Sequence, residues 1–293
     1  MKEGNSMNNT NPLNKIVKSI LIYASLIAIS IIFVLPFWEI LTTSLKTFLE
    51  TTEYPPKFLP QVPQWHNYYS AFVKNADIWP IFTWLKNTVF TTSMVVIGNV
   101  LSGTFIAYGF ARFDGRGKNL WFMLIISTML IPVYSTLVPL FIIFRVIHWY
   151  NTFLPIIVQP FFGFAVYIFL LRQFIMGLPC ELDEAATMDG ANPFGIFFKI
   201  IIPLTMPAII AVGVICFVNA WGDFFTPLIF LSDMKKYTIS VGLSIMQSQM
   251  RQNLTDTHLI ACVTTVVTLP SLIIFFSAQK FFVSGLTLGA VKG

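Results

Sequence analysis

Residues 178–207 read LPCELDEAATMDGANPFGIFFKIIIPLTMP, a charged stretch punctuated by Gly and Pro and set between two long apolar segments. Its acidic residues Glu181, Asp183 and Glu184 stand where the dipole of a helix favours negative charge, with Pro179 suited to the first turn. Ala185, Ala186 and Met188 continue this helix. The stretch therefore opens with a short acidic helix.

A turn and a second helix follow in the same stretch. Gly190 permits a sharp turn, and Asn192 is a typical N-cap with Pro193 at the first helical position. We expect Pro203 and Pro207 to break the second helix just before the next apolar segment. The stretch predicts a helix–turn–helix whose small alanines allow close docking and whose acids could meet a basic partner.

The composition of the chain is that of a membrane protein. Hydrophobic residues make up 56% and charged residues 11% of the 293 residues, with a mean hydropathy of +0.74, whereas soluble domains carry about 25% charged residues. Runs of roughly 20 apolar residues cross a hydrocarbon core of about 30 Å, and barrel strands would be shorter and alternating. We predict an all-α membrane protein with six transmembrane helices, on the runs 19–38, 88–111, 120–144, 152–171, 204–222 (extending to 231) and 259–279.

Basic residues beside the runs predict the orientation of the chain. Arg112, Arg116 and Lys118 cluster in one short loop, which places that loop, the 178–203 loop and both termini in the cytosol. The predicted organisation is a disordered cytosolic tail (1–14), a first transmembrane helix (17–38), an external segment rich in Pro and aromatic residues (39–86), a core domain with five transmembrane helices (87–280) and a cytosolic tail (281–293). The net charge of +5 is spread over loops and helix ends, so no nucleic-acid surface is indicated.

Two features within the runs concern packing and substrate. Asn99, Gly103, Ala107 and Ala111 recur every four residues and predict a closely packed helix face. Asp223 is the one acidic residue well inside a run, and such a charge is a candidate for function.

Asn219 and Asp223 share a helix face, and Trp221 points the opposite way unless the helix breaks at Gly222. Carboxylate, amide and aromatic groups suit a sugar, so these three residues are candidates for a substrate pathway. The alternative is that Asp223 lies at the outer end of the span, hydrated or paired with a neighbouring subunit.

The sequence lacks the motifs expected for ATP hydrolysis or metal binding. The sequence has no phosphate loop of the type G-x-x-x-x-G-K-[ST], so we do not expect this chain to hydrolyse ATP. His66, His148 and His258 are isolated from carboxylate or thiol partners at ligand spacing. We therefore expect neither catalytic residues nor a metal site nor a cofactor in this chain.

The spacing of Glu184-Ala185-Ala186, Gly190, Ile200 and Pro203 resembles the coupling loop of importer-type ATP-binding-cassette permeases. Ile202 stands where that family usually has Leu. The resemblance implies contact with an ATPase through Glu184, Ala185, Ala186, Asp189 and Gly190.

A second resemblance narrows the family. Residues 219–228 and the ending 279–293 are similar to carbohydrate-import permeases of the maltose and multiple-sugar type, closest to the shorter six-span subunit of a permease pair. The resemblance implies a type I importer bundle with a cytosolic coupling helix, in a bacterial inner or plasma membrane. It also implies a second, paralogous permease, two ATPase subunits that bind ATP and Mg, and an extracytoplasmic sugar-binding protein. The tail, with Gly289 and Lys292, would reach between the ATPase subunits.

The function expected from this resemblance is ATP-driven import of a carbohydrate, an oligosaccharide in particular. One alternative is a permease for a non-sugar solute such as a glycerol phosphodiester, which would favour cationic residues in the pathway. A secondary transporter would need ion-coupled charges within the spans, where only Asp223 qualifies.

Overall fold

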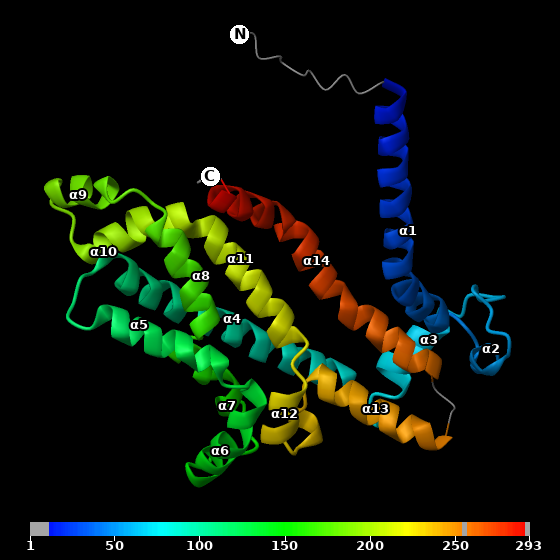
Figure 1. Cartoon of the computed structure of the whole chain (residues 1–293). Coiled ribbons are helices and arrows are strands. Elements are labelled where there is room, and N and C mark those ends of the chain that lie inside the picture. The colour runs from blue at the N-terminus through cyan, green and yellow to red at the C-terminus, as the bar shows by residue number, and fades with distance from the viewer. Residues whose placement is uncertain (1–11, 254–256, 291–293) are drawn as a thin grey trace.

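The computed structural model describes residues 12–253 and 257–290, and all regular structure within them is helical (Figure 1). The longest helices are α1 (Pro12–Ser44), α4 (Ile81–Arg112), α11 (Ile202–Trp221) and α14 (Thr257–Ala290). Between α1 and α4 lie α2 (Phe48–Thr52), α3 (His66–Tyr69) and η1 (Ser70–Lys74). After α4 come α5 (Lys118–Ser127), η2 (Thr128–Leu130), α6 (Val133–Val146), α7 (Leu154–Ile157), η3 (Gln159–Phe162) and α8 (Ala165–Met176). The remaining elements are α9 (Glu181–Met188), α10 (Pro193–Ile196), η4 (Phe197–Ile201), α12 (Phe225–Phe230), η5 (Met234–Lys236) and α13 (Ile239–Asn253).

Five helical segments among the described residues are long and apolar enough to cross a membrane: 16–44, 81–112, 154–176, 193–221 and 257–279. The predicted span 120–144 is not one straight helix. Its two halves, Lys118–Leu130 and Val133–Val146, are bent by 98°, and Pro132 at the break has no N–H to continue the helical hydrogen bonds. The count reaches six when this bent pair is one span.

The structure differs from the prediction at Pro203 and Pro207, which lie near the start of α11. Helices α10, η4 and α11 run on without a break from Pro193 to Trp221, so the expectation that Pro203 and Pro207 end the second helix was wrong. Residues 197–201 form a turn of π-helix directly before Pro203, and this wider turn makes room for a proline ring. The extension of this run to residue 231 was also wrong, because α11 ends at Trp221 and α12 starts anew at Phe225.

The core of the bundle is formed by α4, α8 and α11, and α14 packs along α11 (Figure 1). The predicted close face of α4 is buried at Asn99, Gly103 and Ala107. A Cβ atom on Gly103 would lie 3.5 Å from Leu171 of α8, which is ordinary van der Waals contact. The predicted face is therefore buried in the contact between α4 and α8, where a residue as small as Ala would also fit at position 103.

Helix α1 stands apart from the bundle over most of its length and meets α14 near its carboxyl end (Figure 1). From Ile16 to Trp38 its side chains are exposed, as expected for a helix surrounded by lipid. The segment that follows is held to it by polar contacts: Asn67 Nδ2 donates to the carbonyl oxygens of Ser44 and Lys46, at 2.9 Å each. The Pro-rich segment is therefore folded onto the end of α1.

Candidate functional site

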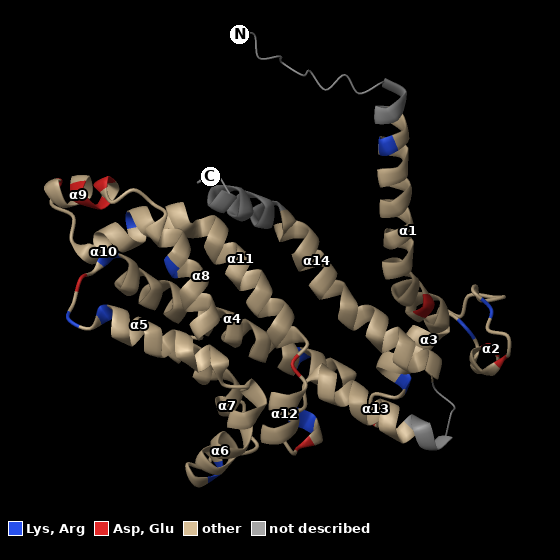
Figure 2. Ribbon diagram, in the orientation of Figure 1, with Lys and Arg blue, Asp and Glu red and all other residues tan. Residues whose placement is uncertain are grey.

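The short helix α9 forms an acidic projection at one end of the bundle (Figure 2). Glu184 and Ala185 are exposed, whereas Ala186 on the inner face is buried in the core with residues of α4, α8 and α11. Pro179 precedes the N-cap Cys180, so the helix starts two residues later than predicted. One side of α9 thus packs on the bundle, and the other leaves carboxylates and Met188 exposed.

Arg112, the last residue of α4, holds α9 in this position. Its Nε lies 2.7 Å from Asp183 Oδ2, and the two side chains are only 8% and 20% exposed. A second guanidinium nitrogen donates to the carbonyl oxygen of Leu178 at 3.0 Å. Because a guanidinium presents several donors in a rigid plane, one side chain fixes both the start of α9 and the loop before it.

The predicted turn and second helix are present. Gly190 has a φ of +81°, and Asn192 Oδ1 accepts from the Gly195 N–H at 2.7 Å with Pro193 at the start of α10. The hydroxyl of Tyr108 on α4 donates to the carbonyl oxygen of Pro193 at 3.3 Å. Helix α4 therefore contacts the stretch on both sides of the turn.

A cavity of about 690 Å³ lies among α4, α6, α8 and α11. Eleven of its twenty lining residues carry side chains able to form hydrogen bonds: Thr91, Thr92, Asn99, Tyr134, Gln159, Tyr167, Cys216, Asn219, Asp223, Thr226 and Thr238. Small-molecule sites commonly enclose about 300–1,000 Å³. The cavity has the size and the mixed polarity of a binding site.

Two of the three residues predicted for a substrate pathway line this cavity. Asn219 Nδ2 donates to Tyr167 Oη at 3.3 Å, and Asp223 Oδ1 accepts from the Thr226 N–H at 3.3 Å. Asp223 lies in the break between α11 and α12 and is half-buried. Trp221 is turned away, since it is buried against α14 and its Nε1 donates to the Val267 carbonyl oxygen at 3.0 Å.

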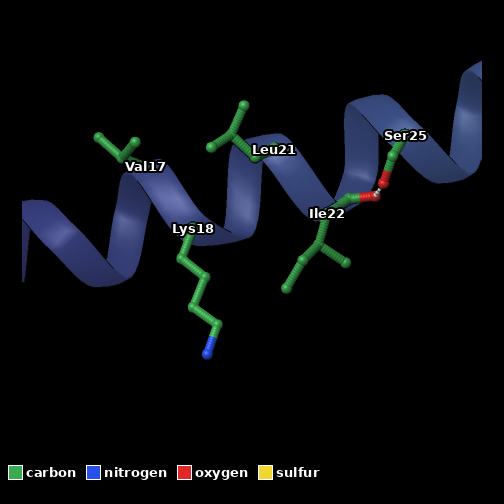
Figure 3. Close-up of a pocket in the computed structure, with 5 residues that line it drawn as sticks. All are labelled: Val17, Lys18, Leu21, Ile22 and Ser25. Atoms are coloured by element: carbon green, nitrogen blue, oxygen red, sulfur yellow. Dashed lines mark hydrogen bonds between the residues drawn. The ribbon is translucent and has the colours of Figure 1, made fainter.

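The hollow on α1 and the predicted C-terminal tail give less evidence of a functional site. A shallow hollow on α1 is lined by Val17, Lys18, Leu21, Ile22 and Ser25, which all belong to that one helix, and the hydrogen bond drawn there joins Ser25 Oγ to the Ile22 carbonyl oxygen (Figure 3). In the predicted tail, α14 continues to Ala290 and includes Gly289. Lys292 lies outside the described residues.

At α9 and at the cavity, the structure adds residues that the sequence analysis missed. Arg112 entered that analysis only as a marker of orientation, although a cation at the end of an apolar run, predicted on the same side of the membrane as the acidic 178–203 loop, was a usable signal. Tyr167 and Gln159 come from a different run, and no spacing in the sequence links them to Asn219 or Asp223. The packing of α8 against α11 brings Tyr167 to Asn219, and η3, which carries Gln159, packs against α4 beside the same cavity.

A helical membrane bundle with a half-open cavity of mixed polarity and a projecting acidic helix at one end is typical of a membrane transport component. The comparisons agree with this class. Residues 99–288 match the family described as "Binding-protein-dependent transport system inner membrane component". This match covers more than half of the chain, which therefore belongs to that family of ATP-binding-cassette importer permeases.

Similar proteins include several sugar permeases. The chain is 33% identical over 240 residues to the arabinooligosaccharides transport system permease protein AraQ of Halalkalibacterium halodurans (80% of this chain, 82% of that protein). It is 32% identical to the melibiose/raffinose/stachyose import permease protein MelC of Bacillus subtilis (88% and 91%), and 31% identical to the sulfoquinovosyl glycerol transport system permease protein SmoH of Agrobacterium fabrum (87% of each).

One solved structure has the same fold over nearly the whole chain. It belongs to a bacterial ABC transporter involved in the import of the acidic polysaccharide alginate. The TM-score is 0.78, with 21% identity and coverage of 95% of this chain and all of the other.

Proposed function

We propose that this chain is the membrane-spanning subunit of an ATP-driven importer and translocates an oligosaccharide delivered by an extracytoplasmic binding protein. The observation that carries the proposal is α9, an exposed acidic helix anchored to the bundle by the Arg112–Asp183 pair. The sugar permeases among the relatives support a carbohydrate as the solute.

In this proposal α9 transmits the movement of a separate ATPase. Glu184 and Asp189 contact the ATPase, Ala185 allows its close approach, Ala186 seats the helix on the bundle, and Gly190 permits the turn. Two ATPase subunits bind ATP and Mg, while this chain carries no cofactor. Closure of the ATPase subunits around ATP shifts the permease between inward- and outward-facing populations, because ATP binds the two states with different affinity.

The proposal assigns the remaining parts as follows. A second, paralogous permease completes the pathway, to which this chain contributes Asn219 and Asp223. The α9 end and both termini face the cytosol of a bacterial cell, with the 39–86 segment outside. The tail with Gly289 and Lys292 reaches towards the ATPase subunits. A glycerol derivative is the second candidate solute, favoured by the similarity to the sulfoquinovosyl glycerol permease.

Affinity purification of the tagged chain in mild detergent tests the proposed assembly. We expect it to bring down a second permease and an ATPase with a phosphate-loop motif. Recovery of this chain alone, together with solute uptake that persists after ATP depletion, would contradict the proposal.

A further inference from the structure

We propose that the cavity among α4, α6, α8 and α11 is a subsite for an uncharged, hydroxyl-rich ligand and discriminates against anionic ones. The inference rests on the proposed function and specifies its substrate class. It concerns a point on which the similar proteins differ, since the substrates in their names include both uncharged and acidic carbohydrates.

The charge of the cavity is the first argument. Among the described residues that line it, Asp223 is the one charged side chain, and no lining residue is Lys or Arg. A sulfonate, phosphodiester or uronate would meet a carboxylate and no cation there. Like charges repel strongly where water is partly excluded, so the lining favours a neutral ligand.

The hydrogen-bonding capacity of the lining is the second argument. Asp223 uses one oxygen for the Thr226 N–H, and no described residue bonds the other. A carboxylate can only accept, so it pairs with hydroxyl donors of a ligand. Gln159 donates its Nε2 to the Pro155 carbonyl oxygen at 2.6 Å, which leaves its Oε1 for a further hydroxyl. Asn219 and the Tyr167 hydroxyl, joined at 3.3 Å, lie beside them in the lining.

Other residues that line the same cavity also carry polar atoms without hydrogen-bond partners. Thr92 Oγ1, Asn99 Oδ1 and Thr238 Oγ1 are buried and form no hydrogen bond within the described part of the chain. All three residues are more than 90% buried and belong to the cavity lining. Buried polar atoms in native proteins nearly always have a partner. Three such atoms in residues that line one cavity leave hydrogen-bonding capacity unused at this site.

Exposed aromatic rings complete the lining. Tyr134 of α6 and Phe164, just before α8, both line the cavity and are substantially exposed. A sugar presents C–H faces as well as hydroxyls, so rings beside carboxylate and amide groups suit it. An anion site would instead concentrate Arg, Lys or backbone N–H groups.

The test uses the assembled transporter in nanodiscs and two trisaccharides, neutral raffinose and anionic trigalacturonate. Saturation-transfer difference NMR reports contact of each sugar with the complex without need of ATP. We expect signal from raffinose and at least tenfold less from trigalacturonate. Asp223→Asn should weaken raffinose binding about tenfold or more, the effect of losing a hydrogen bond to a charged group, and should narrow the preference between the two sugars. Asp77→Asn, the same change on an exposed acid of the 39–86 segment, is the matched control.

Failure of this inference can be distinguished from failure of the proposed function. Equal signals from the two sugars, or an Asp223→Asn complex that assembles normally and binds as the wild type does, would overturn the inference. ATP-driven uptake of raffinose into proteoliposomes is measured in parallel. A raffinose signal that Asp223→Asn weakens, without any ATP-driven uptake by the wild type, would support the subsite and count against the proposed function instead.

Discussion

Replacing Arg112 with Ala should release α9 from the bundle while the spanning helices stay assembled. The Arg112–Asp183 pair is 8% and 20% exposed. Removing one partner of a fully buried pair costs about 3–5 kcal/mol, whereas exposed pairs contribute about 0–1 kcal/mol. Asp183 retains some access to water, but the bond to the Leu178 carbonyl oxygen is lost as well. We therefore expect the opening free energy of α9 to fall by about 1–3 kcal/mol.

Hydrogen exchange measures this change directly. Because 1.4 kcal/mol is a factor of ten, amides of residues 181–188 should exchange about 5- to 150-fold faster in Arg112→Ala, while those in the middle of α4 stay unchanged. Lys118→Ala is the matched control, since it removes an ion pair at the same end whose partner Asp114 is fully exposed. Unaltered exchange of α9 in Arg112→Ala would refute the reasoning.

A functional measurement separates coupling from folding. In proteoliposomes, Arg112→Ala should lower ATP-driven uptake more than ATP hydrolysis, because the ATPase then moves a helix that is loosely attached to α4. The double variant Arg112→Asp with Asp183→Arg keeps an ion pair with reversed charges. It should recover part of the lost uptake, and no recovery would mean that Arg112 acts through other contacts.

Three further changes have defined outcomes. Gly190→Val should abolish ATP-driven uptake without impairing membrane insertion, since a left-handed φ of +81° costs an L residue roughly 1–2 kcal/mol and nothing crowds the site; normal uptake would contradict this. Gly242→Ala would place a Cβ in steric overlap with the Trp84 ring, so the free energy of unfolding in detergent should fall by about 1–3 kcal/mol, and Tm with it, whereas Gly109→Ala, where nothing lies near the added Cβ, should not lower Tm. Backbone N–H groups of Thr47 and Gln61 lower the pKa of Glu50. Its stabilisation of residues 47–61 should therefore be present above its ordinary pKa and be lost as the pH falls through the lowered one. Hydrogen exchange of that segment should show this pH dependence in the wild type and not in Glu50→Gln.

Local rules predicted α9, its turn and the N-cap at Asn192, because each depends on residues within a few positions of one another. The same rules failed at Pro203, where a neighbouring π-helical turn accommodates the ring. They also missed the 98° bend, although Pro132 stands at the break. A hydropathy window averages over 20 residues and does not register where a helix changes direction.

The cavity could be predicted only in part. Asn219 and Asp223 were found because polar groups are rare in an apolar run, and Trp221 was included because an aromatic ring suits a sugar, on the condition that the helix breaks at Gly222. The structure turns Trp221 towards Val267 of α14. Tyr167 is brought to Asn219 by helix packing, a contact between residues 52 positions apart that leaves no local pattern.

The central claim is that a separate ATPase drives this permease through α9, and site-specific photo-cross-linking tests it most directly. A benzophenone side chain replaces Met188, which is 88% exposed on α9, and in a control replaces Phe58, 74% exposed in the segment between α1 and α4. The account predicts that the probe at residue 188 captures an ATPase subunit carrying a phosphate-loop motif and that the probe at residue 58 does not. Failure to capture the ATPase from residue 188, in cells where uptake continues after ATP depletion, would contradict it.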